Sequence, residues 1–372
     1  MNKRIFKNQT TDKGDVPFFK ISTFGKKADS FISNNLFEKY KEKYPYPQKG
    51  DLLISASGSI GRIVEYKGQK AYYQDSNIVW LNHNKELLNI YLKAYYQIIH
   101  WHGIEGSTIK RLYNKNILAT SIFVPDKKEQ YELGKLIKKA EKIISLQQRK
   151  LELLKLFKIG MLQNILADTK AASKLKFNGS NQEWRPRRLN SITNIITKGT
   201  TPHFKQASNG VNFIKIEDIS KDNGKIYPRS FITEKENNGY LKRSQLKAGD
   251  LLFSIAGTLG RVGKVTDDIL PANTNQALAI IRLKPSQNID FCKIMLESDS
   301  VKRYIHANPT MGAQPNLSLK QISDLTLFFP DIKEQTLISQ LIKKIDNLLA
   351  LQYQNISKFK QLKQFLLQNI FI

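Results

Sequence analysis

Two short glycine-flanked loops carry hydroxyl groups beside an arginine, a combination suited to holding phosphate groups. Residues 50–63 read GDLLISASGSIGRI and residues 249–262 read GDLLFSIAGTLGRV. Because glycine lets the backbone approach a ligand closely, these loops can bring donors to the phosphates of a polyanion. The candidate residues are Ser57, Ser59 and Arg62 in the first loop and Thr258 and Arg261 in the second. The alternative for each is a structural role in capping the loop.

Two further groups of polar residues have the types that read the edges of nucleic-acid bases. Arginine and lysine suit guanine, whereas glutamine and asparagine suit adenine. The candidates are a polar loop and two equivalent positions of the chain: Lys198, Thr200, Thr201 and His203, then Lys110 with Arg111, then Gln314 with Asn316. We expect the two equivalent positions to read different bases. Loop capping is again the alternative.

The charge of the chain also indicates a polyanionic partner. The 372 residues include 59 Lys plus Arg and 32 Asp plus Glu, a formal net charge of +27. Nucleic acid is therefore the first candidate, although lysines that merely solvate helical faces are an alternative explanation. The N-terminal residues are basic but precede no apolar stretch, and no run of about eighteen apolar residues occurs. We expect a cytoplasmic protein.

The residue patterns of catalytic sites are missing from the sequence. There is no GxxxxGK[ST] loop, no glycine-rich S-adenosylmethionine motif and no metal-ligand spacing among the five histidines. Asn308-Pro309 is followed by Thr and Met, unlike the adenine-holding motif of amino-methyltransferases. The single Cys292 excludes a disulfide framework and a cysteine-based zinc cluster. We expect a non-catalytic chain with no cofactor or metal, and a solitary methyltransferase or nuclease is the enzyme alternative.

The positions of these residues follow from a duplication of the chain. The two glycine-flanked loops are offset by 199 residues, and VPFFKI at residues 16–21 corresponds to VNFIKI at residues 211–216. Further along, the offset is 205 residues, as between LQNI at residues 162–165 and LQNI at residues 367–370. Two similar units of roughly two hundred residues are therefore expected.

Each copy changes character once along its length. Its first part has short runs of β-branched and aromatic residues broken by turn formers, which predicts a β-rich domain. Its second part keeps an apolar period of 3.5 residues, which predicts a long helix with a coiled-coil face. Both helices begin with Pro-Asp-x-x-Glu-Gln, where Asp126 and Asp331 are placed to cap the helix. A nuclease signature is disfavoured because it needs a wider spacing and strand placement.

The apolar seam of each long helix is interrupted at the same two places. Gln147 and Lys158 interrupt the first helix, and Gln352 and Lys363 interrupt the second. A parallel pair would place the two lysines face to face, whereas an antiparallel pair lets the glutamines meet and moves each lysine to the apolar first third of its partner. We expect an antiparallel pair related by a pseudo-twofold axis. Separate packing of each helix on its own domain is the alternative.

The chain resembles the specificity subunits of type I restriction-modification systems. The resemblance is carried by the two GDLL loops, GAQPNL at residues 312–317 with STIKRL at residues 107–112, KGTTP at residues 198–202 and the paired helix starts. It implies a non-catalytic subunit that binds a split target in double-stranded DNA. The implied partners are two modification subunits, which use S-adenosylmethionine to methylate adenine, and two restriction subunits with motor and nuclease activity.

The resemblance also implies the architecture. It is an α+β fold with two similar target-recognition domains, each followed by a long helix, and the helices pair as an antiparallel coiled coil with pseudo-twofold symmetry. The expected segments are recognition domain 1 (1–122), spacer helix 1 (123–167), a linker (168–183), recognition domain 2 (184–328) and spacer helix 2 (329–372). A DNA-binding regulator or inhibitor that dimerises through its helices is the alternative function.

One departure from the pattern concerns the first domain. The second copy opens at Trp184, some 27 residues ahead of Val211, whereas only fifteen residues precede Val16. We therefore expect the first recognition domain to be N-terminally shortened, with a strand or short helix missing or replaced.

Overall fold

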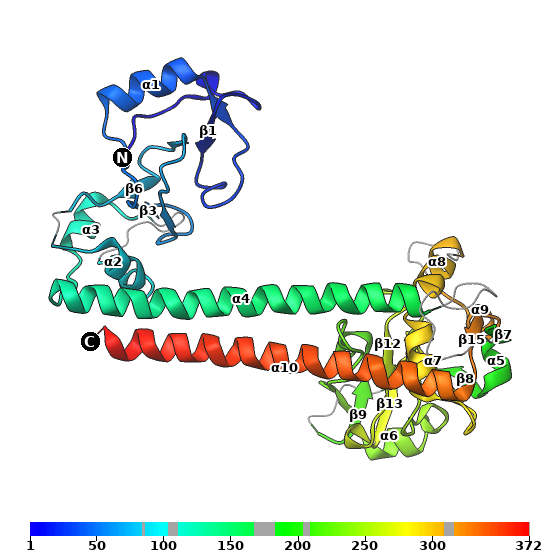
Figure 1. The fold of residues 1–372 in the computed structure, drawn as a ribbon. Helices are drawn as coiled ribbons and strands as arrows, with labels where there is room; N and C mark the ends of the chain where they lie inside the picture. The colour runs from blue at the N-terminus through cyan, green and yellow to red at the C-terminus, as the bar shows by residue number, and fades with distance from the viewer. Residues whose placement is uncertain (84–85, 103–110, 167–182, 204–208, 309–315, 372) are drawn as a thin grey trace. The chain divides into compact units, whose positions relative to one another are not determined.

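The computed structural model describes residues 1–83, 86–102, 111–166, 183–203, 209–308 and 316–371 (Figure 1). The fold is α+β, as expected, with two long helices. The chain forms two compact units. Unit 1 comprises Met1–Arg149 and Gln354–Ile372, and unit 2 comprises Lys150–Tyr353. Each unit thus combines one β-rich part with a portion of both long helices. The segment boundaries expected from the sequence repeat stay a prediction.

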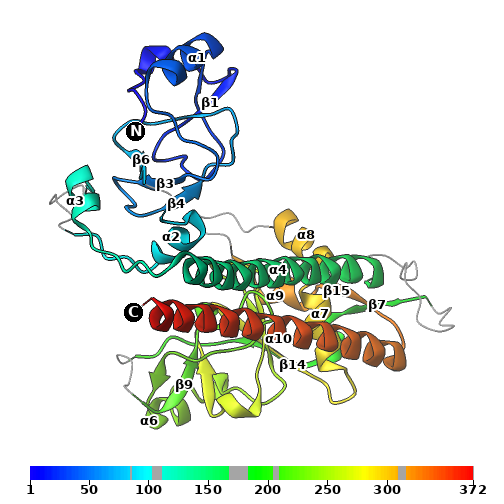
Figure 2. The ribbon, with the colours of Figure 1, turned by 60° about the vertical axis from the view of Figure 1, so that its left-hand side comes forward.

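Unit 1 contains two small three-stranded sheets. In the first, β1 pairs antiparallel with β2 and parallel with β5; in the second, β3 pairs antiparallel with β4 and β6. The strands are β1 (Val16–Phe19), β2 (Phe31–Ile32), β3 (Leu52–Ser55), β4 (Ile63–Glu65), β5 (Tyr72–Tyr73) and β6 (Ile78–Trp80). The short helices are η1 (Lys7–Gln9), α1 (Asn34–Lys43), α2 (Asn89–Tyr95) and α3 (Asn114–Ala119). In Figure 2, β3, β4 and β6 lie together next to α2.

Unit 2 repeats this arrangement with additional strands. Its sheets have the orders β10-β9-β13, β12-β11-β14-β8 and β15-β7. The strands are β7 (Arg185–Arg188), β8 (Thr193–Lys198), β9 (Val211–Ile214), β10 (Phe231–Ile232), β11 (Leu251–Ser254), β12 (Val262–Lys264), β13 (Ala272–Thr274), β14 (Leu278–Leu283) and β15 (Thr326–Phe329). The short helices are α5 (Leu189–Ile192), η2 (Ile216–Asp218), α6 (Glu234–Asn238), η3 (Lys242–Ser244), η4 (Asp267–Ile269), α7 (Ile289–Leu296), α8 (Asp299–Ala307) and α9 (Leu319–Ser323).

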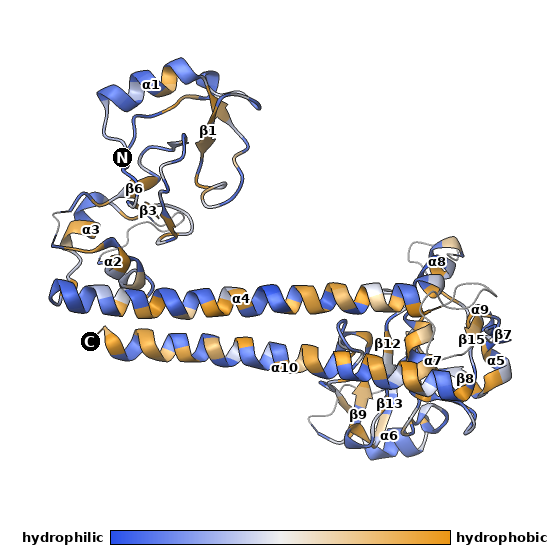
Figure 3. Ribbon diagram, viewed as in Figure 1, coloured by the Kyte–Doolittle hydropathy of each residue, from blue (hydrophilic) through white to orange (hydrophobic). Residues whose placement is uncertain are grey.

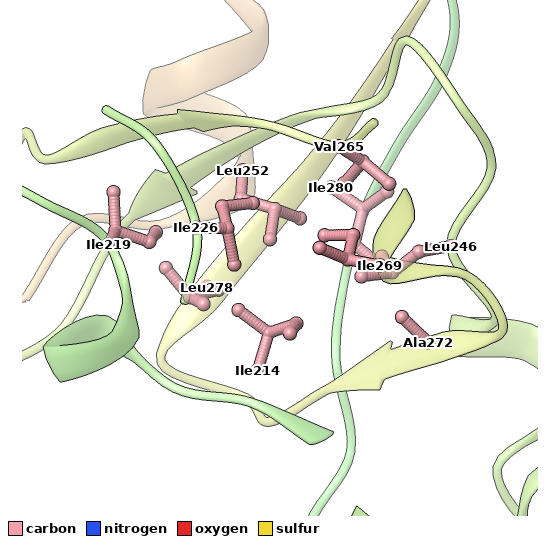
Figure 4. Close-up of a cluster of buried hydrophobic side chains, with 10 residues drawn as sticks. All are labelled: Ile214, Ile219, Ile226, Leu246, Leu252, Val265, Ile269, Ala272, Leu278 and Ile280. Atoms are coloured by element: carbon pink, nitrogen blue, oxygen red, sulfur yellow. The ribbon is translucent and has the colours of Figure 1, made fainter. Parts of the chain in front are cut away.

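The central strand has the same environment in both units. Every residue of β3 and of β11 is buried, because each strand lies between two neighbours and both of its faces are covered. In unit 2, alternate side chains of β11 and β14, including Leu252, Leu278 and Ile280, enter a core with Ile214 and Ile226 (Figure 4). Continuous apolar runs such as LLIS and LLFS are the sequence pattern of strands buried on both faces. The GDLL repeat is therefore the centre of each β-rich part.

The two β-rich parts differ at the edge of this sheet. In unit 2, β8 pairs with β14 as a fourth strand, and β7 pairs with β15. In the part of unit 1 that the structure describes, no strand occupies the place of β7 or β8. The N-terminal shortening expected for the first domain stays a prediction.

The long helices are α4 (Lys127–Ile165) and α10 (Ile332–Ile370), each of 39 residues. The Asp126 Oδ1 atom accepts a hydrogen bond of 2.9 Å from the Glu129 amide, and Asp331 accepts an equivalent bond of 2.9 Å from the Glu334 amide. The predicted helix caps are therefore confirmed. The last residue of the motif also has a role, since the Gln130 side chain donates to the Pro125 carbonyl at 2.8 Å and holds the helix start.

Within each unit, the portions of α4 and α10 run antiparallel. In unit 1, Ile137 packs in one cluster with Leu367 and Phe371, and one turn further along α4 the Glu141 carboxylate accepts a hydrogen bond of 2.9 Å from Lys363. Contacts across the two helices also occur in unit 2, and they include a similar ion pair. There, the Lys155 ammonium lies 5.5 Å from the centre of the Tyr353 ring, and Lys158 donates to Asp346 at 2.5 Å.

These ion pairs differ from the expected environment of the seam lysines. Lys158 and Lys363 were expected to lie against apolar surface, but each contacts a carboxylate of the opposite helix. An ammonium group that is largely withdrawn from water needs a compensating charge, which Asp346 and Glu141 supply. Gln352 is buried in unit 2 and Gln147 is partly buried in unit 1. Their mutual pairing stays a prediction.

Candidate nucleic-acid interface

The first glycine-flanked loop is built around a buried serine. The Ser55 hydroxyl donates to the Ser59 carbonyl and accepts a hydrogen bond of 2.9 Å from the Arg62 amide. The Gly61 amide donates to the Ser55 carbonyl at 3.0 Å. Gly58 and Gly61 have φ of +65° and +81°, a conformation that favours glycine. The loop is therefore closed from below by Ser55, and Ser59 is left on its exposed tip.

The second loop has the same construction. The Ser254 hydroxyl donates to the Thr258 carbonyl at 2.5 Å and accepts a hydrogen bond of 2.7 Å from the Arg261 amide. The Gly260 amide donates to the Ser254 carbonyl at 3.0 Å. Thr258 is exposed at the position that Ser59 occupies in the first loop. The two loops therefore have the same construction, and each is anchored by a buried serine. The sequence comparison aligned these two serines but did not identify them as the anchors.

The loop arginines contact backbone carbonyls. The Arg62 guanidinium donates to the Phe24 carbonyl at 2.9 Å, and Arg261 donates to the Ile216 carbonyl at 2.8 Å. Both side chains are partly buried. These bonds tie each loop to the chain segment beside it, which is the structural role considered as the alternative. Phosphate binding by the two arginines stays a prediction.

The base-reading candidates Arg111 and Asn316 lie beside these loops. Arg111 forms an isolated β-bridge with Ser57, and Asn316 forms one with Ala256. The next amide in each segment donates to the loop strand, from Leu112 to the Ala56 carbonyl and from Leu317 to the Ile255 carbonyl, both at 2.8 Å. Both candidate side chains are exposed. The structure thus places different residue types, Arg111 and Asn316, at equivalent positions beside the two loops. The other two candidates of this group, Lys110 and Gln314, lie outside the described residues.

Ser57 itself is largely buried. Its hydroxyl donates to the Asn77 side-chain oxygen at 2.7 Å, which orients it within the loop. A β-bridge places Ser57 next to Arg111, but its side-chain contact is internal. Binding of a ligand by Ser57 stays a prediction.

The polar loop after β8 is held by residues that sequence reasoning missed. Thr200 accepts hydrogen bonds of 3.3 Å from Arg243, Thr201 donates to Gln276, and the His203 ring lies 3.8 Å from the Tyr240 ring between centroids. Lys198 ends β8 with an exposed side chain. Arg243 and Tyr240 come from a basic, aromatic stretch, YLKRS, whose composition was the available indication.

Two features of the described residues bear on metal binding and on thiol chemistry. No three His, Cys, Asp or Glu side chains there are placed to hold a metal ion. Cys292 is buried in α7, and burial raises the pKa of its thiol to about 12, so the thiolate is scarcely populated at neutral pH. None of the described helices, including the two of 39 residues, has an apolar stretch long enough to cross a membrane.

The paired loops and long helices have counterparts among known proteins. A family profile described as "Type I restriction modification DNA specificity domain" matches residues 1–156 and 181–361. The chain belongs to this family. As a family member it is a specificity-subunit protein, which agrees with the resemblance found in the sequence.

Individual relatives match parts of the chain. A putative type I restriction enzyme specificity subunit of Haemophilus influenzae is 54% identical over 142 residues, which is 38% of this chain and 37% of that protein. The EcoBI specificity subunit of Escherichia coli is 26% identical over 175 residues, 45% of this chain and 35% of that protein. The match to the MjaVIII specificity subunit of Methanocaldococcus jannaschii is 22% identical and covers 85% of this chain and 74% of that protein. The matches to the first two relatives thus span little more than a third of their length.

Solved structures of this family share the fold. The crystal structure of a type I restriction-modification S subunit from M. genitalium has a TM-score of 0.58 at 15% identity and covers 100% of this chain and 92% of that chain. A chain from a structure of type I complex assembly and conformational transition has a TM-score of 0.59 at 15% identity, covering 95% and 90%. At this identity the comparison supports the fold alone.

Proposed function

We propose that this specificity-subunit protein recognises a two-part DNA sequence, one part with each unit, and carries two modification subunits. The single observation on which the proposal depends is the repeated loop. Each unit presents the same serine-anchored loop, and beside it stands Arg111 in one unit and Asn316 in the other. One scaffold with different base-reading side chains is the construction expected of a reader of two unlike half-sites.

The charge supports DNA as the ligand. A net charge of +27 favours a polyanion, and each phosphate neutralised by lysine or arginine contributes roughly 0.9 to the slope of log K against log salt. A titration of the assembled complex between low and physiological salt is expected to give a steep slope. A slope near zero contradicts DNA binding through phosphate contacts.

The surface of the long helices supports the scaffold role. Exposed apolar side chains recur at matching places of α4 and α10, which Figure 3 shows as repeated orange segments along both helices. The matching pairs are Ile143 with Leu348, Leu146 with Leu351, and Phe157 with Leu362. Exposed apolar residues arranged along a helix are typical of a surface that a partner covers. Two equivalent surfaces favour two modification subunits, which would supply the S-adenosylmethionine chemistry and recruit the restriction subunits.

The contacts between the helices support a coiled coil with pseudo-twofold symmetry. The Lys158–Asp346 pair of unit 2 and the Lys363–Glu141 pair of unit 1 join equivalent positions of the duplicated chain. Such an arrangement would present the two recognition domains to a DNA target with an unspecified gap between its halves.

A selection experiment tests the proposed recognition. The assembled complex with a modification subunit is bound to DNA in which both half-sites are randomised, using the parent chain, Asn316→Ala and Arg111→Ala. Each substitution is expected to relax sequence preference in one half-site only, and loss of a bidentate base contact costs about 1–3 kcal/mol. Loss at both half-sites, or unchanged preference, contradicts the assignment of these residues to base reading.

A further inference from the structure

In unit 1 the glycine-flanked loop is held between two other segments of the chain. The Leu112 amide donates to the Ala56 carbonyl at 2.8 Å, and the Ala56 amide donates to the Asn77 carbonyl at 2.8 Å. Asn77 belongs to the turn that precedes β6. The loop therefore joins the segment that carries Arg111 to the start of β6.

The backbone of unit 2 repeats this junction. The Leu317 amide donates to the Ile255 carbonyl at 2.8 Å, and the Ile255 amide donates to the Ala277 carbonyl at 2.9 Å. The registers of β6 and β14 on their central strands give the same equivalence of residues. Asn77 and Ala277 therefore occupy equivalent places in the two units.

The side chains at this junction differ as a pair. In unit 1 the Ser57 hydroxyl donates to the Asn77 Oδ1 atom at 2.7 Å, and Ser57 is 7% exposed. The equivalent residues of unit 2 are Ala256 and Ala277, whose side chains have no polar atom. A buried hydroxyl without a hydrogen-bond partner is costly, so Ser57 suits the junction only together with a partner such as Asn77. Both members of the pair are thus polar in one unit and apolar in the other.

The turn of unit 2 is fixed by a local contact. There, the Ala277 amide donates to the Asn275 Oδ1 atom at 3.1 Å, a bond within the turn itself. In unit 1 the Asn77 side chain instead reaches Ser57, and the backbone of Ser57 forms the β-bridge with Arg111. The Ser57–Asn77 hydrogen bond therefore connects the turn before β6 to the segment that carries the base-reading candidate.

The two base-reading candidates make different demands on their support. Arg111 carries its guanidinium at the end of a long side chain, and a bidentate contact with guanine needs this planar group to align with the base edge. A small rotation of the backbone displaces such a group more than it displaces the amide of the shorter Asn316 side chain. Since a binding group must be held within about 0.5 Å of its productive position, the backbone at Arg111 needs the firmer support.

We propose that Ser57 and Asn77 are positioning residues for base reading by unit 1. Their hydrogen bond fixes the backbone of Ser57 against the turn before β6, and the β-bridge transmits this restraint to Arg111. The two residues act through Arg111 and do not contact the DNA themselves. The proposal rests on the proposed function, in which Arg111 reads one half-site.

A selection with both half-sites randomised tests the effect on recognition. The assembled complex contains the parent chain, Arg111→Ala, or the double variant of Ser57→Ala with Asn77→Ala. The double variant removes both polar groups together and reproduces the alanine pair of unit 2, so the fold is retained. Arg111→Ala identifies the base that Arg111 reads. The double variant is expected to lower discrimination at the same base roughly three- to tenfold and to leave the other half-site unchanged.

A combination of the substitutions tests whether the pair acts through Arg111. In the Arg111→Ala background, the double substitution is expected to cause no further loss of discrimination at that base, because the positioned side chain is already gone. An additional loss in this background overturns the proposal, since Ser57 or Asn77 then contributes to recognition independently of Arg111.

Amide hydrogen exchange of the complex without DNA separates positioning from direct contact with a base. In the double variant the Leu112 amide is expected to exchange roughly threefold faster or more, whereas the rate at Leu317 stays unchanged. Relaxed preference with an unchanged Leu112 rate means that Ser57 or Asn77 contacts the base directly, which overturns the proposal.

The matched control is another buried serine of unit 1. Ser30 is 9% exposed, and its hydroxyl donates to the Asp29 carboxylate at 3.1 Å. Ser30→Ala is expected to leave both base preference and the Leu112 rate unchanged, and an effect equal to that of the double variant overturns the proposal. If Arg111→Ala relaxes the preference and the double variant does not, the positioning role alone is wrong. If Arg111→Ala itself has no effect, the assignment of Arg111 to base reading is wrong as well.

Discussion

The β-rich parts of the two units share the serine-anchored loop but differ in the polar residues that support the sheet beside it. In unit 2, the Asp250 carboxylate is 1% exposed and receives two hydrogen bonds of 2.7 Å from the Arg282 guanidinium. In unit 1, the position of Arg282 is occupied by the exposed Asn82, and the equivalent Asp51 accepts a hydrogen bond from the Gln48 amide at 2.7 Å. The loop geometry is therefore independent of this ion pair.

The largest expected effect is on the buried ion pair. Arg282→Ala leaves the Asp250 carboxylate buried without its partner, and breaking such a pair costs about 3–5 kcal/mol. Chemical denaturation, with hydrogen exchange resolved by unit, is expected to show this loss in unit 2. Asn82→Ala, the equivalent change in unit 1, is expected to stay within about 0.5 kcal/mol. Equal losses of unfolding free energy for the two variants would mean that Arg282 and Asn82 contribute equally to the stability of their units.

A smaller and symmetrical effect is expected at the loop anchors. Ser55→Ala and Ser254→Ala each leave a partly buried arginine amide and a loop carbonyl without their serine partner, which costs about 1–3 kcal/mol. Hydrogen exchange at Gly61 and Gly260 is expected to rise by a similar factor in the two variants. As controls, Ser59→Ala and Thr258→Ala change exposed hydroxyls and should alter stability by less than about 0.5 kcal/mol. A loss of stability in only one of the two variants would show that the two loops are not equivalent.

The smallest expected effect concerns the ion pairs between the long helices. A double-mutant cycle of Lys158→Met with Asp346→Asn is expected to give a coupling energy of about 0.5–1 kcal/mol, and the cycle of Lys363→Met with Glu141→Gln a similar value. A double-mutant cycle between Lys158 and Glu141, which lie far apart on α4, serves as the control, because no coupling energy is expected between them. Thermal denaturation at low and high salt provides the measurement. A coupling energy in only one of the two cycles would show that the two ion pairs do not contribute equally to the pairing of the helices.

The sequence predicted the features that repeat. The GDLL strands, the helix caps at Asp126 and Asp331 and the equivalence of Arg111 with Asn316 all depend on local patterns or on direct comparison of the two copies. These features are visible because the same residue types recur at a fixed offset.

The remaining features depend on contacts between distant residues. The carbonyl partners of Arg62 and Arg261 are 38 and 45 residues away, so no local pattern showed that these side chains are partly committed to the fold. The partners of Lys158 and Lys363 were likewise unassigned, because Glu141 and Asp346 lie outside the apolar seam. Ser55 and Ser254 recur at equivalent positions of the sequence. Only the fold shows that their buried hydroxyls anchor the loops, rather than lying on the exposed loop surface.

The helix ion pairs have a consequence for how such chains are assembled from parts. The offset of 205 residues that relates the two copies also relates Lys158 to Lys363 and Glu141 to Asp346. Each long helix therefore carries both the lysine and the carboxylate, and the joint between the halves is self-complementary. One half, with its β-rich part and helix, offers to a copy of itself the same contacts that it offers to the other half. Halves with different β-rich parts are in this sense interchangeable components, because exchanging one of them keeps the lysine and the carboxylate of the joint.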